Sequence, residues 1–221
     1  MASPHINQIP PHEILLDFVY QDDFLLVVNK PAELLAVPGR GLDKADNLTS
    51  RVQKEFPDAL SVHRLDMSTS GLLILARGKE MHSRLSQLFR DRSVKKCYTA
   101  LVAGRKMSNQ GTVDLPLGPD WPNRPRQKVD FANGKISLTR YSLLAHDPVA
   151  GISRVALEPV TGRTHQLRVH MAAIGRPILG DPLYGQKFAS NTGRMMLHAR
   201  MLSFIHPFSM EPLNVVSEAP F

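Results

Sequence analysis

A single carboxylate stands in a polar bend directly before an apolar run. Residues 62–71 read VHRLDMSTSG, and the apolar residues 72–76 follow at once. Asp66 is the acidic residue of this bend, and Arg64 lies two positions before it. Bends that connect rigid strands often carry catalytic side chains, so Asp66 is a candidate for nucleophilic or acid–base chemistry. Because Asp also stabilises turns, a purely structural role stays open on this pattern alone.

A second polar block, residues 159–171, reads PVTGRTHQLRVHM. It gathers four polar side chains at the start of an expected helix: Arg163, Gln166, Arg168 and His170. A helix N-terminus favours anions, so a phosphate or a carboxylate could bind there, although a solvated basic helix face is the alternative. Residues 175–185 follow with three glycines and two prolines, which indicates a fixed backbone path.

The elements that must position these blocks follow from hydrophobic periodicity. Strands are expected at residues 13–20, 24–29, 72–76, 95–103, 137–144, 153–159 and 196–205. Helices are expected from a cap at Asn47 or Asp46 through Arg51 to Phe56, at residues 79–92 and at 164–175. The Pro-rich, basic residues 117–135 are interpreted as a long surface loop. Strands outnumber helices, which predicts an α+β fold with a largely antiparallel mixed β-sheet and flanking helices. Residues 1–12 are expected to form a flexible N-terminal tail, and residues 13–221 a single domain.

The composition narrows the class of protein. The chain has 221 residues, with 27 Lys and Arg against 20 Asp and Glu, a net charge of +7. This balance favours a polyanionic partner such as RNA. We see no apolar run of about 20 residues and no secretory signal, so we expect a cytoplasmic protein without a membrane span. Nothing in the sequence suggests more than a monomer. Cys97 is the single cysteine, which excludes an internal disulfide and a Cys-based zinc site.

The sequence lacks the motifs of several common classes of enzyme. We find neither a P-loop nor a dinucleotide-binding fingerprint. His165 and His170 are five residues apart rather than the four that place two metal ligands on one helix face. A Gly-x-Ser-x-Gly elbow is also missing, although a hydrolase using Ser70 or His63 stays open. The other alternative is an RNA-binding or folding factor without essential catalysis.

Five segments, taken together and in order, resemble the motif set of the RluA-type RNA pseudouridine synthases: residues 63–71, 95–98, 162–171, 178–181 and 197–199. The match runs from about residue 24 to 207. The loop at 120–129 resembles the subgroup with dual specificity, which modifies a hairpin of large-subunit (23S) rRNA and the tRNA anticodon stem-loop. The resemblance implies the pseudouridine synthase fold with an active-site cleft. It also implies isomerisation of uridine to pseudouridine in RNA, without a cofactor or a metal.

The resemblance also implies roles for single residues. Asp66 is the essential carboxylate, which attacks the nucleotide or abstracts a sugar proton; either role needs the ionised form, which a nearby cation favours. Arg168 pairs with Asp66, and Tyr98 stacks on the target base. Arg64 fills the space that the flipped base vacates and contacts phosphate, and Leu197 forms an apolar wall. Further basic residues are expected to contact RNA: Arg40, Arg124, Arg126, Lys128 and Arg163.

Overall fold

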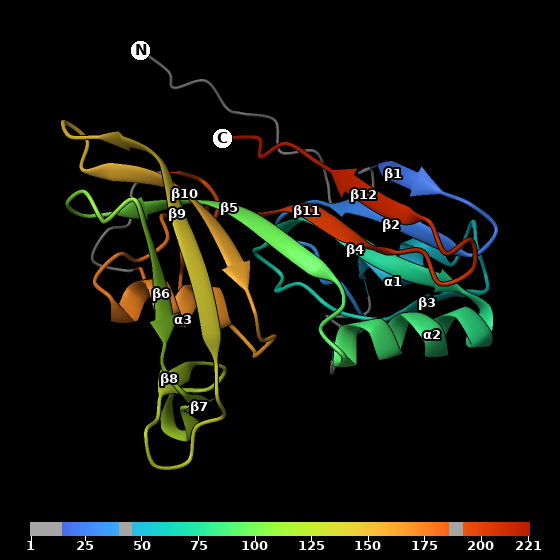
Figure 1. Cartoon of the computed structure of the whole chain (residues 1–221), viewed down its shortest axis with the longest axis horizontal. Coiled ribbons are helices and arrows are strands. Elements are labelled where there is room, and N and C mark those ends of the chain that lie inside the picture. The colour runs from blue at the N-terminus through green and yellow to red at the C-terminus, as the bar shows by residue number, and fades with distance from the viewer. Residues whose placement is uncertain (1–14, 40–45, 186–191) are drawn as a thin grey trace.

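The computed structural model describes residues 15–39, 46–185 and 192–221. One large mixed sheet dominates these residues (Figure 1), in the order β1-β2-β4-β11-β5-β10-β9-β6, with β12 paired to β11 and β3 to β4. Its strands are β1 (Phe18–Gln21), β2 (Leu25–Lys30), β3 (Ala59–Ser61), β4 (Ser70–Arg77), β5 (Lys95–Ala103), β6 (Gln110–Asp114), β9 (Leu138–Asp147), β10 (Ile152–Pro159), β11 (Leu197–Ile205) and β12 (Pro212–Val216). Every pair is antiparallel except β11 with β4. The predicted fold class is confirmed.

Helices cover both faces of the sheet around β4. Ile74 packs in one core cluster with Leu85 from α2 (Gly78–Arg90). Leu75 points to the opposite face and packs in a second cluster with Leu48 from α1 (Leu48–Val52). Covering both faces explains why β4 is a continuous apolar run instead of an alternating one. The strand that follows the Asp66 bend is therefore rigidly held.

The second half of the sheet, which consists of β5, β10, β9 and β6, packs on α3 (Gln166–Ala173). Leu167 and Met171 of this helix meet Val155 and Leu157 of β10 in a third core cluster. Tyr98 on β5 borders this cluster as well as the one around α1. Figure 1 shows α3 beneath β9 and β10 and α2 beneath β3 and β4, with β5 and β11 between them. Tyr98 thus lies where the two halves of the sheet meet.

The interpretation of residues 117–135 as one long loop is wrong. Three short elements lie within it: β7 (Leu117–Pro119), a 3₁₀ helix η3 (Trp121–Asn123) and β8 (Gln127–Val129). β7 and β8 pair antiparallel and project from β6 and β9 as a separate hairpin (Figure 1). Strands of three residues are too short to show a period of two, and the prolines obscured the pattern further.

Other boundaries differ from the prediction. The first strand is confined to Phe18–Gln21, while residues 13 and 14 of the predicted strand and the predicted tail lie outside the described residues. The predicted Asn47 cap is confirmed, because its side chain accepts a 2.9 Å hydrogen bond from the Ser50 N–H, but the helix that follows, Leu48–Val52, ends before Phe56. β3, β6 and β12 were not predicted. No helix among the described residues is long and apolar enough to cross a bilayer.

Candidate active site

Asp66 lies in the segment between β3 and β4, residues 62–69, which we call the Asp66 loop. The loop ends where β4 meets β11 in their parallel pairing, with Gly71 opposite Ala199. Gly71 has φ of +110°, and a Cβ there would lie 2.4 Å from the Ala199 carbonyl oxygen. Only glycine permits this backbone conformation and close approach. The glycine after the Asp66 bend therefore brings the loop against the centre of the sheet.

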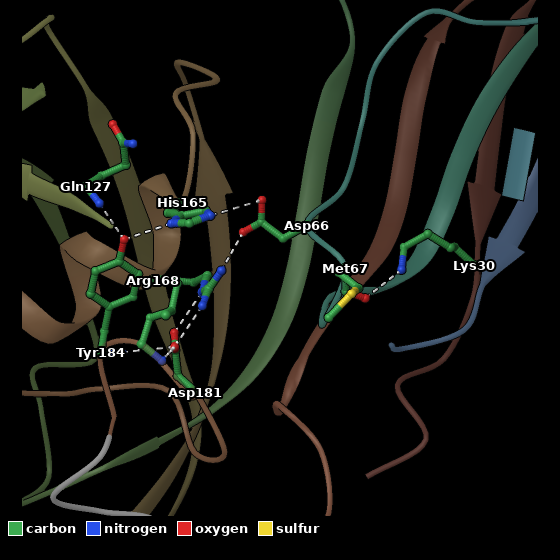
Figure 2. Close-up of polar contacts among 9 residues, drawn as sticks. Lys30, Asp66, Met67, Gln127, His165, Arg168, Asp181 and Tyr184 are labelled. Carbon is green, nitrogen blue, oxygen red and sulfur yellow. Dashed lines mark hydrogen bonds and ion pairs between the residues drawn. The ribbon is translucent and has the colours of Figure 1, made fainter. Parts of the chain in front are cut away.

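A buried lysine fixes the other side of the Asp66 loop. Lys30, at the end of β2, has no solvent exposure. Its Nζ donates hydrogen bonds of 2.7, 2.7 and 3.0 Å to the carbonyls of Pro31, Leu34 and Met67. Burial lowers the pKa of Lys30 to about 7, and the charges of Glu33 and Asp66 only partly counter this effect. Because Met67 follows Asp66 directly, Lys30 holds the backbone beside the carboxylate (Figure 2).

Arg168 on α3 bridges two carboxylates (Figure 2). Its Nη1 donates a 2.9 Å hydrogen bond to Asp66 Oδ2, while Nε and Nη2 donate bonds of 2.8 and 2.9 Å to the two oxygens of Asp181. Burial acts to lower the pKa of Arg168, but the hydrogen bonds and charges of Asp181 and Asp66 outweigh it and raise the pKa. The fork of a guanidinium suits this arrangement, since one donor pair fixes its plane and a third donor reaches Asp66.

Asp181 is the inner member of this group. Its side chain is fully buried, and Oδ1 also accepts the backbone N–H groups of Leu183 and Tyr184 at 2.8 and 3.1 Å. Burial alone would raise the pKa of Asp181, but Arg168 and the backbone donors outweigh it and lower the pKa. The ionised Asp181 therefore orients Arg168 toward Asp66.

His165 approaches the other oxygen of Asp66. Its Nε2 lies 3.8 Å from Asp66 Oδ1, and its Nδ1 lies 2.8 Å from the Tyr184 hydroxyl. Burial lowers the pKa of His165 and outweighs the opposing charge of Asp66. The residue has φ of +54°, a left-handed conformation that non-glycine residues adopt rarely.

Asp66 opens into a cavity of about 480 Å³, a size typical of small-ligand sites. The four residues predicted to support catalysis or bind the base also line it: Arg64, Tyr98, Arg168 and Leu197. Tyr98 is half-buried, and burial followed by the charge of Asp66 raises the pKa of its hydroxyl. Leu197 is 3% exposed. An aromatic ring, an aliphatic wall and a carboxylate thus surround one space.

The cavity is strongly basic. Among the described residues, six cationic side chains line it, against the single carboxylate of Asp66: Arg64, Arg90, Arg92, Lys96, Arg163 and Arg168. Arg64 is exposed, whereas burial and then the nearby Arg92 lower the pKa of Lys96. A polyanion such as an RNA backbone complements this charge.

The remaining predicted RNA contacts fall at different places. Arg163 lies at the cavity, whereas Arg124 and Lys128 are exposed on the β7–β8 hairpin, where Arg124 stacks 3.8 Å from the centre of the Trp121 ring. Arg126 turns inward, since it donates to the Leu183 carbonyl and lies over the Tyr184 ring. Arg40 lies outside the described residues.

The two groups considered for a hydrolase are occupied. His63 Nε2 accepts the backbone N–H of Ile74 at 2.9 Å, and burial lowers the pKa of His63 to about 3. Ser70 is 3% exposed and bonds to His198 Nδ1 at 2.8 Å, and it does not line the cavity. Neither side chain is placed to activate a nucleophile there.

The polar block at the start of α3 divides into two roles. Gln166 and His170 are buried and hold β9, through bonds of 3.0 and 2.9 Å to the Thr139 hydroxyl. Arg168 instead donates hydrogen bonds to two carboxylates, those of Asp66 and Asp181. Among the described residues, no group of three or more His, Cys, Asp or Glu side chains could hold a metal ion.

Comparison with known proteins identifies the family. Residues 24–173 match the profile of the RNA pseudouridylate synthase family. The chain belongs to this family. It is 48% identical to the dual-specificity RNA pseudouridine synthase RluA of Escherichia coli K12, over 97% of this chain and 98% of that protein. The corresponding Pasteurella multocida protein is 46% identical, over 98% and 99% of the two chains.

Solved structures of pseudouridine synthases show the same fold. Human RNA pseudouridylate synthase domain containing 1 aligns with a TM-score of 0.77 and 34% identity, covering 94% of this chain and 84% of that one. Human RNA pseudouridylate synthase domain containing 4 aligns with a TM-score of 0.72 and 27% identity, covering 92% and 88%. The chain is therefore an RNA pseudouridine synthase, an isomerase.

Sequence reasoning did not place four groups of this site: Lys30, His165, Asp181 and Tyr184. The Gly- and Pro-rich residues 175–185 were a signal for the last two, because a fixed backbone path there positions Asp181 beneath Arg168. Nothing in the sequence distinguished His165 from the other histidines.

Proposed function

We propose that this synthase converts uridines in a hairpin of large-subunit (23S) rRNA and in the tRNA anticodon stem-loop, with Asp66 as its essential carboxylate. The observation that carries the proposal is the Asp66–Arg168 pair, at 2.9 Å, in a basic cavity that an aromatic and an aliphatic side chain complete. The near full-length similarity to proteins named as dual-specificity synthases supports the two RNA classes.

The reaction exchanges one bond to the ribose for another. The bond from uracil N1 to ribose C1′ breaks, the uracil turns, and its C5 bonds to C1′, so N1 gains a proton and C5 loses one. Atoms and electrons balance within the nucleotide. Asp66 starts the exchange either by attack on the nucleotide or by abstraction of a sugar proton, and both steps use the carboxylate that the Arg168 guanidinium orients through its hydrogen bond.

The target must leave its stack before Asp66 can reach it, at a cost of a few kcal/mol. Tyr98 lines the cavity beside Asp66 and stacks on the extruded base, which keeps the detached uracil in place while it turns. Leu197 closes the apolar side. Arg64, exposed at the same cavity, takes the space that the base has left. Recognition rests on loop shape and splayed bases because single-stranded loops present them.

Phosphate contacts come from two surfaces in this proposal. Arg163 lies at the cavity with the newly identified Arg90 and Arg92, and Arg124 and Lys128 extend from the hairpin. Arg126 supports the hairpin from within, through the Leu183 carbonyl. Arg40 is included on the resemblance alone.

The test is tritium release from RNA labelled at C5 of uridine, with total tRNA and a 23S rRNA transcript as substrates. Wild type should release tritium from both RNAs, and Asp66→Asn from neither, while RNA binding by Asp66→Asn stays within about threefold. Asp23→Asn, an exposed change outside the site, is the matched control and should behave as wild type. Release from one RNA class alone would refute dual specificity. Intact binding without release by wild type would indicate an RNA-binding factor instead.

A further inference from the structure

A chain of polar groups connects the basic hairpin to the catalytic carboxylate (Figure 2). The backbone N–H of Gln127 in β8 donates a 2.7 Å hydrogen bond to the Tyr184 hydroxyl, which lies 2.8 Å from His165 Nδ1. His165 Nε2 in turn faces Asp66 Oδ1 at 3.8 Å. Gln127 stands between Arg126 and Lys128, so the chain begins within the hairpin's basic sequence.

The hydrogens of this chain follow from the donors available. The Tyr184 hydroxyl accepts from Gln127 and has one proton to give. Donation of that proton to Nδ1 leaves the neutral imidazole with its hydrogen on Nε2, directed at the carboxylate. The opposite tautomer would place a lone pair against the negative charge of Asp66. Burial lowers the pKa of His165, which keeps this ring neutral.

The two oxygens of Asp66 are held unequally. Oδ2 accepts the 2.9 Å hydrogen bond from Arg168. Oδ1 accepts no hydrogen bond from any described residue. The nitrogen that faces it is His165 Nε2. A separation of 3.8 Å is too long for a hydrogen bond, but catalytic contacts are often loose before substrate binds and shorten in the complex.

His165 has a backbone conformation that costs free energy. The residue precedes α3 in the left-handed region, at φ of +54° and ψ of +17°. Such a conformation costs a non-glycine residue free energy and tends to occur at functional sites. Its side chain is 10% exposed and packs edge-on against the Tyr184 ring at 5.7 Å. The fold therefore holds the imidazole in a single direction, toward Asp66.

We propose that His165 is a positioning residue, which holds Asp66 Oδ1 during the reaction and is itself held by Tyr184 and the β7–β8 hairpin. RNA seated on Arg124 and Lys128 presses on the same hairpin whose backbone fixes Tyr184, so substrate docking and carboxylate geometry are linked. This inference rests on the proposed function, because it assigns a role within that reaction.

Two substitutions at position 165 separate the parts of this role. Asn tolerates the left-handed conformation and offers a polar group near the position of Nδ1, but has nothing at the position of Nε2. Gln extends an amide N–H to the position of Nε2. His165→Asn should lower kcat about ten- to hundredfold, the range for one hydrogen bond to a charged group, with KM changed less than threefold. His165→Gln should recover most of that loss.

The pH profile gives a readout that a structural role would not move. Protonated His165 would pair tightly with Asp66 and would no longer accept the Tyr184 proton, so wild-type kcat should fall as pH drops through the His165 pKa. In His165→Gln the acid limb should move to lower pH. The charged and titratable groups around the imidazole are Asp66 and Arg64 from the Asp66 loop, Arg168 from α3, and Asp181 and Tyr184 from the following loop.

The experiment measures kcat, KM and their pH dependence by tritium release, on whichever RNA wild type converts. His146→Asn is the matched control, because His146 also bonds a hydroxyl through Nδ1, at 2.9 Å to Ser153, but lies on β9 away from the cavity. It should match wild type. Tyr184→Phe should lower kcat, and Tyr184→Phe with His165→Asn should be no slower than His165→Asn alone, because both act through one chain.

The outcomes are distinct. Wild-type kcat and pH profile in His165→Asn would overturn the inference, and so would equal losses in the Asn and Gln variants or multiplicative losses in the double variant. Inactivity of wild type itself on every RNA would instead contradict the proposed function.

Discussion

Replacing Asp181 by Asn tests whether the buried carboxylate, and not its shape, orients Arg168. Asp181 is fully buried and accepts two hydrogen bonds from Arg168, at 2.8 and 2.9 Å. Asn has nearly the same volume. It removes the negative charge, however, and directs an amide N–H₂ group toward the guanidinium, so at least one of these two bonds is lost.

The magnitude follows from what each partner keeps. Removing one member of a buried ion pair costs about 3–5 kcal/mol. The lower end applies because Arg168 retains Asp66 through Nη1, and because the Asn oxygen can still accept from Leu183 and Tyr184. We expect a loss of about 3 kcal/mol in the free energy of unfolding. For a chain of this length that lowers Tm by about 6–12 °C.

The loss should also depend on pH. The folded-state pKa of Asp181 lies below its unfolded value, so its contribution is fully present above the unfolded pKa of about 3.9. It declines as pH falls below that value toward the folded pKa. The difference between wild type and Asp181→Asn should therefore be constant from pH 8 to 5 and shrink below about pH 4.

Urea unfolding followed by circular dichroism, at several pH values, gives the free energies. Asp58→Asn is the matched control, because Asp58 pairs with Arg77 at 2.8 Å with 45% of its side chain exposed. An exposed pair contributes about 1 kcal/mol or less. If Asp181→Asn costs no more than Asp58→Asn, the buried carboxylate does not hold Arg168 and the reasoning fails.

Two further predictions concern the backbone around Asp66. Gly71→Ala should lower the free energy of unfolding by roughly 3 kcal/mol or more, because the new Cβ would clash with the Ala199 carbonyl. Gly78→Ala is the control: Gly78 has φ of +75° but open space around it, so this change should cost only the left-handed strain of about 1–2 kcal/mol. Equal losses in thermal unfolding for the two variants would exclude the clash. Lys30→Met should remove a pH dependence. The folded pKa of Lys30 is lowered to about 7 from 10.5, so the unfolded chain binds the extra proton between these values and wild-type stability rises with pH there. A wild-type minus Lys30→Met difference that stays flat from pH 7 to 9 in urea unfolding would refute this prediction.

The sequence predicts the long elements of this fold well, because each carries several periods of its pattern. Residues 95–103 form a strand with the expected bounds, and the helix expected at 79–92 is α2. The β7–β8 hairpin could not be predicted, because each of its strands has only three residues. The strand order could not be predicted either, because the parallel contact of β11 with β4 joins segments that are far apart in the chain.

The candidate site divides in the same way. Asp66 and Arg168 could be named from motifs that the chain shares with a family, and the structure places them 2.9 Å apart. Lys30 and Asp181 could not, because their importance lies in burial and in partners supplied by distant segments. His165 was considered only for metal spacing, and neither its backbone conformation nor its direction toward Asp66 is readable from sequence.

The site is assembled from both halves of the sheet, which explains why so many of its supports are distant in sequence. Lys30 of the first half holds the Asp66 loop through the Met67 carbonyl. Asp181, beside the second half, holds Arg168. The Asp66–Arg168 bond therefore spans the junction at which Tyr98 lies, and its geometry depends on how the halves pack. A substitution in either support should lower activity without touching substrate, because each one moves only one partner of the pair.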